Sequence, residues 1–349
     1  MWVRSKLAAI QWLQLIEISA GATLSILFAE MLGLRYGSAA GIITLLTIQQ
    51  TRGKTLNTAV KRMLSFVLMV MLSYATMGLL GFHTAVFGLF LLLYVGASFA
   101  LEWVPVMSSN AVLATHFLLE KSMAWPLVFN ELGLLAIGAA VGVVLNLVLP
   151  YRRRPLQHYR DQVEDKFRTI LRVMARRILG ECLAEGQVTA CTPQLRTKED
   201  EQIRQDFAEL EARLSRYESL AAEESENRLL SGSSYPQAYF QMRSQQLLLL
   251  KRMWDSLERV DAGYEMNHLL SALFQTTADT FAEKNNAEQL LLLHAQIEQA
   301  YEQTILPRDR QEFRNRALLY AMLMDIRSFL VVKRSFIDSS KFSDSQHSW

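Results

Sequence analysis

The sequence predicts an all-α protein in which a six-helix transmembrane bundle is followed by a cytoplasmic antiparallel helical bundle. Residues 1–150 hold only 8 Lys and Arg and 5 Asp and Glu, whereas residues 151–349 hold 28 and 29. The weakly charged part consists of long apolar stretches, and the charged part has apolar residues at helical spacing. We therefore predict a transmembrane domain in 1–150, a helical-bundle domain in 151–338 and a disordered tail in 339–349.

Six apolar stretches in the first segment are candidates for membrane spans. A helix needs about 20 residues to cross the hydrocarbon core, and the second stretch is the shortest. Arg4 and Lys6 precede the first stretch as in a secretory signal peptide, but Gln11, Gln14 and Glu17 interrupt its apolar run and further apolar stretches follow. We therefore expect this stretch to be retained as a span. The predicted spans are 15–33, 36–50, 61–80, 84–101, 104–119 and 127–149.

The basic residues of the first segment cluster at alternate ends of the predicted spans. They lie before the first span, between the second and third, and after the sixth. The turns on the opposite side carry only Arg35 and Lys121. Because Lys and Arg are enriched in cytoplasmic loops, this pattern places both termini in the cytoplasm.

The sequence GKT at 53–55 is also the end of a phosphate-binding loop pattern. That pattern requires a glycine at position 48, which is Ile48, and a soluble strand before the loop. We therefore interpret 51–62 as a cytoplasmic loop in which Lys54 and Arg62 anchor the chain at the lipid headgroups. Attraction of an anionic solute by the same two residues is the alternative.

Polar side chains within the predicted spans are costly in hydrocarbon and therefore face protein or water. They either hydrogen-bond between helices or line a solute path, and the sequence leaves both alternatives open. Glycines four residues apart, at 37 and 41 and at 138 and 142, predict close helix packing within the chain. The candidates for a solute path or its inner mouth are Gln49, Gln50, Arg52, Lys54, Arg62, Asn110, His116, Glu131 and Asn146.

Three stretches, AEMLGLRYGSAAGIITLLTIQQTRGKTLNTAVKRMLSF, VLATHFLLE and NELGLLAIGAAVGVVLNLVLP, resemble the first member group of the aromatic acid exporter family in order and spacing. The charged segment resembles the C-terminal domain of that family, so the likeness covers nearly the whole chain. It implies a multi-pass bacterial inner-membrane protein, export of aromatic or other organic acids, and a homodimer of six-span units. Relatives usually begin the first span with a basic residue, where this chain has Glu17. Recurring positions of the family are occupied by Arg52, Arg62, His116, Glu131 and Asn146.

The charged segment is predicted to form four or five antiparallel helices. Apolar side chains three and four residues apart mark one helix over 203–221. Pro307 suits the first turn of another helix, where Asp309 and Glu312 would lie favourably near its positive end. Further helices are predicted over 156–179 and 237–264, with loops at 180–193 and 231–236.

We find no catalytic, cofactor-binding or metal-binding pattern and do not expect an enzyme. Cys182 and Cys191 have no neighbours at metal-ligand spacing, which predicts free thiols in a reducing compartment. No basic domain indicates nucleic-acid binding.

Two functions remain. The first is a transporter that exports small organic anions, aromatic carboxylic acids among them, with the lipid bilayer as its surroundings and a cytoplasmic regulatory or dimerising domain. The alternative is a membrane-anchored sensor or protein-interaction module without transport activity, which the size of the soluble segment favours.

Overall fold

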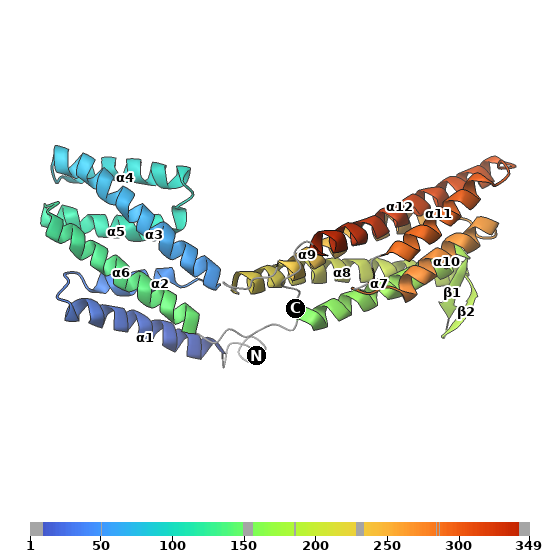
Figure 1. Ribbon diagram of the computed structural model, residues 1–349, viewed down its shortest axis with the longest axis horizontal. Coiled ribbons are helices and arrows are strands. Elements are labelled where there is room, and N and C mark those ends of the chain that lie inside the picture. Colours follow the sequence, from blue (N-terminus) through green and yellow to red (C-terminus); the bar gives the residue numbers. More distant parts are fainter. Residues whose placement is uncertain are drawn as a thin grey trace. The chain divides into compact units, whose positions relative to one another are not determined.

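The computed structural model describes residues 10–341, except 50, 149–155, 185, 228–233, 284 and 286. The chain divides into two compact units, each described here by itself (Figure 1). The first comprises Met1–Arg152 with Glu226–Leu230, and the second comprises Arg153–Ser225 with Ser231–Trp349. The described residues are mostly helical, which confirms the prediction of an all-α protein apart from one short hairpin.

The described residues of the first unit up to Val148 form six α-helices, and the third continues into a short π-helical turn. The helix α2 packs against both α1 and α6, while α3 packs against α5 and α6, and α4 against α5. Their bounds are α1 Ile10–Met31, α2 Ser38–Thr47, α3 Arg52–Ser73, η1 Tyr74–Gly78, α4 Thr84–Ala100, α5 Val104–Glu120 and α6 Trp125–Val148.

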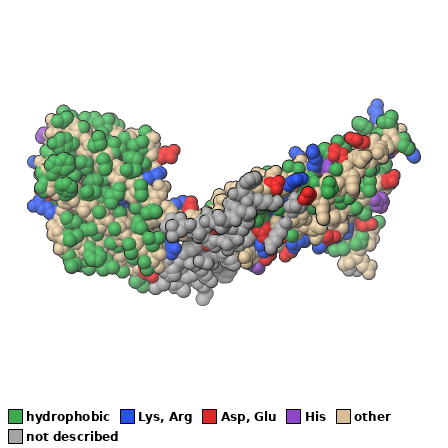
Figure 2. Space-filling view, viewed as in Figure 1, with side chains coloured by type: hydrophobic (Ala, Val, Ile, Leu, Met, Phe, Trp, Pro, Cys, Tyr) green, Lys and Arg blue, Asp and Glu red, His purple; other side chains and the backbone are tan. Residues whose placement is uncertain are grey.

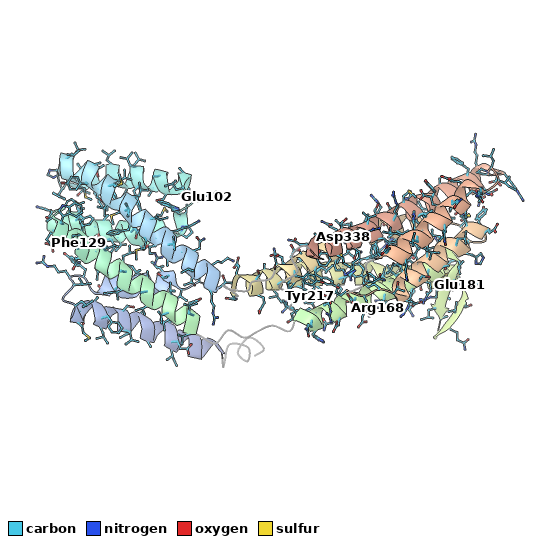
Figure 3. All side chains as sticks on the ribbon, viewed as in Figure 1. Glu102, Phe129, Arg168, Glu181, Tyr217 and Asp338 are labelled. Carbon is cyan, nitrogen blue, oxygen red and sulfur yellow. A yellow bond between two sulfur atoms is a disulfide. The ribbon has the colours of Figure 1, made fainter. Side chains whose placement is uncertain are left out.

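The exterior of the first unit is apolar. Many large hydrophobic side chains on its helices are exposed, and hydrophobic atoms cover most of the face seen in Figure 2. Phe129 of α6, for example, is 63% exposed (Figure 3). Among the described residues, Arg52–Gly78 and Trp125–Val148 are long and apolar enough to cross a membrane, and Ser38–Thr47 and Thr84–Ala100 are shorter apolar helices. The six-span arrangement stays a prediction.

Glycines allow α1, α2 and α6 to approach closely. A Cβ atom at Gly138 would lie 2.6 Å from the carbonyl oxygen of Ala40, and one at Gly142 would lie 2.8 Å from the Cβ of Thr47. On α2, a Cβ atom at Gly41 would lie 2.8 Å from a side-chain carbon of Ile26. The close packing that the glycine spacing predicts therefore occurs within the chain, between α6 and α2 and between α2 and α1.

The stretch 51–62 was predicted to be a loop, which is wrong because the chain is helical from Arg52 onward. The cytoplasmic location of this stretch stays a prediction. Thr51 has extended backbone dihedrals and its hydroxyl accepts a hydrogen bond from the Lys54 amide at 3.3 Å. A threonine at this position satisfies one of the unpaired amides of the first turn, which is why α3 begins at Arg52. The basic residues of this stretch therefore project from a helix.

The second unit is a helical bundle with its own hydrophobic core. The helix α9 packs along α12 and α10 along α7, and buried leucine, phenylalanine and methionine side chains fill the space between them. Tyr159 of α7 stacks on Tyr217 of α8 with ring centroids 4.4 Å apart, and the bundle that carries Arg168 and Tyr217 is seen in Figure 3. The helices are α7 Leu156–Ile178, α8 Pro193–Asn227, α9 Tyr235–Leu257, α10 Glu265–Asp279, α11 Glu288–Glu302 and α12 Arg310–Lys341.

The number of helices and one helix boundary differ from the prediction for this segment. The described part of the second unit has six helices, since the stretch predicted as one helix over 237–264 ends at Leu257. Gly263 has a φ of +102°, a conformation that glycine tolerates and that separates α9 from α10. At the other end α12 continues to Lys341, so the first residues of the predicted tail are helical, and 342–349 lie outside the described residues.

The predicted loop at 180–193 contains an antiparallel hairpin, and the prediction of free thiols is wrong. Strand β1 (Glu181–Ala184) pairs with β2 (Gln187–Ala190) and brings Cys182 opposite Thr189. Cys191, just beyond β2, therefore lies with its Cα 4.9 Å from that of Cys182, and the two form a disulfide. The spacing of the cysteines gave no indication of this because the hairpin register decides it.

Candidate functional site

Polar and charged side chains gather in the interior of the first unit, in two groups. The first group surrounds the end of α2 and the start of α3. The second lies where the end of α5, the start of α6 and the link between α1 and α2 meet. Glu131 and Asn146 mark the two groups on α6, and their separation of 15 residues corresponds to about 22 Å along a helix.

Arg62 is the central residue of the first group, and it is fully buried. Its Nη1 donates to the carbonyl oxygen of Ile43 at 2.9 Å and to Oγ1 of Thr47 at 2.6 Å. Its Nη2 donates to the carbonyl oxygen of Leu46 at 3.1 Å. The Leu46 carbonyl belongs to the last turn of α2, where the carbonyl groups have no further helical amides to pair with and carry partial negative charge.

The burial of Arg62 is therefore compensated by the end of a helix. The Nε atom of Arg62 is also buried and has no hydrogen-bond partner in the part of the chain that the structure describes. The hydrogen-bonding capacity of the guanidinium is therefore not fully used by the described residues. The side-chain amide of Asn110 donates to the backbone carbonyl of Arg62 at 3.0 Å, which fixes α5 against α3.

Three other predicted residues meet at the same end of the unit. Asn146 of α6 donates to the carbonyl oxygen of Gln49 at 2.9 Å, and the amide of Gln49 donates to Oγ1 of Thr55 at 2.9 Å. Arg52 donates to the carbonyl oxygen of Leu147 at 2.9 Å. These bonds tie the irregular segment between α2 and α3 to the last turn of α6.

The two remaining predicted residues of this region are Lys54 and Gln50. The side chain of Lys54 is about half exposed and forms an ion pair of 3.2 Å with Glu226, which belongs to the same compact unit. Gln50 lies outside the described residues.

The second group is centred on a buried histidine and glutamate. Nδ1 of His116 lies 2.7 Å from Oε2 of Glu131, and the Glu131 side chain is not exposed at all. The other carboxyl oxygen of Glu131 accepts a hydrogen bond from Asn130 at 3.0 Å. The ring of Tyr36 stacks on the His116 ring with centroids 4.0 Å apart.

This group continues to the surface through Tyr36. Its hydroxyl donates to Oε1 of Glu120 at 2.9 Å, and the same oxygen lies 3.3 Å from Nη1 of Arg35. A buried titratable pair is thus connected to an exposed ion pair by one aromatic side chain.

The interior of the first unit also holds buried hydroxyl groups that pair between helices. Ser25 of α1 and Thr44 of α2 are 2.6 Å apart, and Thr44 also donates to the carbonyl oxygen of Gly138 at 3.1 Å. Ser65 of α3 and Tyr94 of α4 form a second pair at 2.6 Å. These residues were not predicted as candidates, since single hydroxyls in apolar helices give no distinctive signal. Tyr36 and Tyr94 were missed because an aromatic side chain there is indistinguishable from a core residue.

Comparison with known proteins identifies the family. Residues 13–149 match "Aromatic acid exporter family member 1". Residues 153–334 match "Putative aromatic acid exporter C-terminal domain". The chain belongs to the aromatic acid exporter family. Members of this family are membrane exporters by description, so a membrane and a small-molecule substrate follow for this member.

Two individual proteins are similar to this family member. The uncharacterized protein YqjA of Bacillus subtilis (strain 168) is 25% identical over 321 residues, which cover 92% of this chain and 94% of YqjA. A solved structure described as "Crystal structure of putative membrane protein from Clostridium difficile 630" is 18% identical, with a TM-score of 0.42. The match spans 52% of this chain and 99% of the chain in that structure. The low TM-score of the second gives no argument about the fold.

Proposed function

We propose that this aromatic acid exporter family member carries small organic anions, aromatic carboxylic acids among them, out of the cell across the bacterial inner membrane. In this proposal the first unit crosses the membrane six times and has both termini in the cytoplasm. Two copies form a homodimer, and the second unit is a cytoplasmic domain that regulates transport or holds the dimer together. The family match over nearly the whole chain supports the class of function.

The observation that carries the proposal is a buried arginine inside a unit with an apolar exterior. Arg62 has no acidic partner within 4.0 Å among the described residues, and its Nε donor is unsatisfied. A buried cation with a free donor is a binding site for an anion, because guanidinium groups bind carboxylates through charge-assisted hydrogen bonds. Arg52 would add to the positive potential at the same end of the unit.

In this proposal the solute passes from Arg62 to the His116–Glu131 pair and meets buried hydroxyl groups of the first unit on the way. Thr44, Ser65 and Tyr94 offer hydrogen bonds that replace part of the hydration of a carboxylate. Interhelical hydrogen bonding in a protein without transport is the competing interpretation of the same residues. The proposal therefore depends on a flux measurement.

The test is efflux of radiolabelled benzoate and related aromatic carboxylates from proteoliposomes that contain the full-length protein. We expect flux above that of protein-free liposomes, and a loss of about tenfold or more in Arg62→Gln, since a charge-assisted hydrogen bond contributes about 1.5–3 kcal/mol. Lys61→Gln is the matched control, because it removes the same charge from the neighbouring position of α3. Flux equal to protein-free liposomes for every carboxylate tested would favour the sensor or interaction module.

A further inference from the structure

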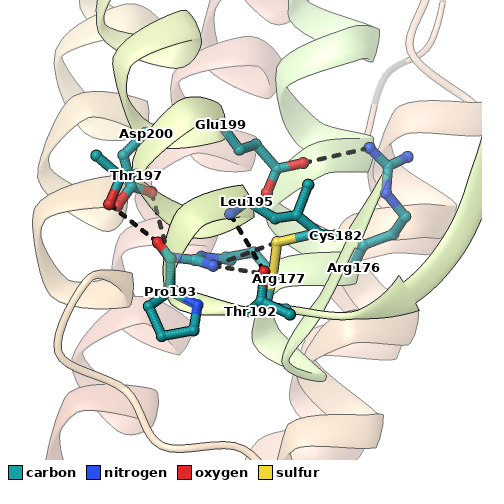
Figure 4. Close-up of a disulfide and its surroundings, with 10 residues drawn as sticks. Arg176, Arg177, Cys182, Thr192, Pro193, Leu195, Thr197, Glu199 and Asp200 are labelled. Atoms are coloured by element: carbon teal, nitrogen blue, oxygen red, sulfur yellow. Dashed lines mark hydrogen bonds and ion pairs between the residues drawn. A yellow bond between two sulfur atoms is a disulfide. The ribbon is translucent and has the colours of Figure 1, made fainter. Parts of the chain in front are cut away.

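The disulfide of the second unit lies beside a buried arginine. Cys182 is 1% exposed, and Cys191, after β2, is partly exposed. The amide of Cys191 donates to the carbonyl oxygen of Gly180 at 2.9 Å, which holds the base of the hairpin closed. Figure 4 shows the disulfide between the end of α7 and the start of α8.

Arg177, in the last turn of α7, directs its guanidinium at both sulfur atoms. Nη1 lies 3.0 Å from Sγ of Cys191 and 3.5 Å from Sγ of Cys182. Nη2 lies 3.2 Å from Oδ1 of Asp200, and Arg177 is only 6% exposed. A neutral disulfide gives such a buried cation little stabilisation, whereas a thiolate would form a charge-assisted hydrogen bond with it.

We propose that Cys182 and Cys191 form a reversible thiol–disulfide site that exchanges with low-molecular-weight disulfides. A guanidinium beside a thiol stabilises the thiolate, which is the reactive nucleophile. It also stabilises the reduced pair relative to the disulfide, so this disulfide is more readily reduced than a bridge in neutral surroundings. The proposal concerns the second unit alone and is independent of the transported solute.

The exposure of the two sulfurs sets the order of the steps. The Cys191 thiolate attacks a disulfide RSSR, which forms a Cys191–SR mixed disulfide and releases one thiolate, RS⁻. The Cys182 thiolate then attacks the sulfur of Cys191, which forms the Cys182–Cys191 bond and releases the second RS⁻. Both electrons removed from the protein reduce the RSSR, and reduction by two RSH molecules reverses the sequence.

A metal site is the alternative use of these cysteines. The Sγ atoms of both cysteines and a carboxylate oxygen of Glu199 lie within 4.8 Å of one another. The guanidinium of Arg177 contacts both sulfurs, however, and its charge opposes a cation there. Burial raises the pKa of the Glu199 carboxyl, which weakens it further as a ligand for a metal at neutral pH.

Single-cysteine variants of the full-length protein in detergent test the order of attack. After incubation with oxidised glutathione, Cys182→Ser should accumulate one glutathione on Cys191, whereas Cys191→Ser should accumulate almost none. Wild-type protein should instead form the internal disulfide and lose it again with reduced glutathione. Equal labelling of both variants, or a wild-type disulfide that glutathione reduces only after unfolding, would refute the exchange site.

Two arginine variants test the role of the guanidinium. In the Cys182→Ser background, Arg177→Gln should slow mixed-disulfide formation at neutral pH about tenfold, and the difference should shrink as rising pH ionises the thiol without help. Arg176→Gln is the matched control, because Arg176 is the adjacent residue on α7 and its recorded ion pair is with Glu199. An equal rate of mixed-disulfide formation at every pH in Cys182→Ser alone and in Cys182→Ser combined with Arg177→Gln or Arg176→Gln contradicts the proposal. One tightly bound zinc ion per reduced chain that blocks glutathione labelling would establish the metal site instead.

Discussion

Arg62, His116 and Glu131 show how much about a single residue can be predicted from the sequence when its contacts in the fold are unknown. The sequence marks His116 and Glu131 as polar groups in apolar surroundings, and it marks Arg62 as a basic residue of a predicted cytoplasmic loop. It does not pair His116 with Glu131, since they are 15 residues apart on different helices. It also gives no indication that the end of α2 would compensate Arg62, because that depends on where α2 stops. The sequence therefore names candidate residues, whose role stays a prediction, but it does not give their contacts.

Lys333 of the second unit carries a residue-scale prediction about pH. Its side chain is 4% exposed, its ammonium donates to the carbonyl oxygen of Glu283 at 2.5 Å, and burial lowers the pKa of Lys333 to about 7. The charge of Arg243 lowers this pKa further, and the carboxylates of Glu164 and Glu283 raise it. In the unfolded chain a lysine has a pKa of about 10.4.

The sign of the effect follows from proton binding. Between pH 7 and 10 the unfolded chain holds a proton at this lysine that the folded chain lacks, so stability rises with pH over this window. Lys333→Met should remove that rise and stabilise the protein at pH 7 by an amount on the order of a few kcal/mol, since one pKa unit equals about 1.4 kcal/mol. Urea unfolding at several pH values measures both effects. Lys198→Met, at an exposed position on α8, is the control and should preserve the wild-type pH profile.

At the scale of elements, the helices of the first unit were predictable because apolar length and short connections define them. The second unit was less predictable. The break between α9 and α10 was missed because α9 ends at Leu257 within a stretch that continues with helix-forming residues, and the positive φ of Gly263 follows only six residues later. The hairpin of β1 and β2 was missed because two four-residue strands have no periodicity long enough to recognise. The positions of these elements are determined by local turns and strand register rather than by the hydrophobic pattern of the sequence.

The glycines of α6 support a prediction about helix packing. Gly138→Ala would place a Cβ atom 2.6 Å from the carbonyl oxygen of Ala40 and 2.7 Å from the Cβ of Ile43, so α6 and α2 would have to separate. Such overpacking costs about 1–3 kcal/mol, and we expect a lower melting temperature in detergent.

Gly96→Ala on α4 is the matched control for this change. No heavy atom lies within 4 Å of a Cβ atom built at Gly96. Alanine is favoured over glycine inside a helix by about 0.5–1 kcal/mol, so this variant should melt at the same temperature or slightly higher. If Gly138→Ala also leaves the melting temperature unchanged, the close contact between α2 and α6 does not exist in the folded protein.

At the scale of the whole molecule, the two units differ in the polarity of their surfaces and therefore in the solvent that each surface favours. The exterior of the first unit is largely apolar, so water is a poor solvent for it. The second unit buries its own leucine and phenylalanine core and exposes mixed charges, many of them in ion pairs such as Lys251–Glu211. The contrast in charge between the two parts of the sequence already indicated this difference.

This contrast predicts that residues 153–349, expressed alone, fold as a helical domain that stays soluble without detergent and unfolds cooperatively, whereas residues 1–152 require detergent. The physical reason is that the core of the second unit is built from its own helices α7–α12. Circular dichroism and size-exclusion chromatography of both fragments provide the measurement. Within the soluble fragment, Leu270→Asp should abolish cooperative unfolding because Leu270 is fully buried, while Leu292→Asp should not because that side chain is 63% exposed. A fragment 153–349 that aggregates, or unfolds without cooperativity, would mean that its core depends on the first unit.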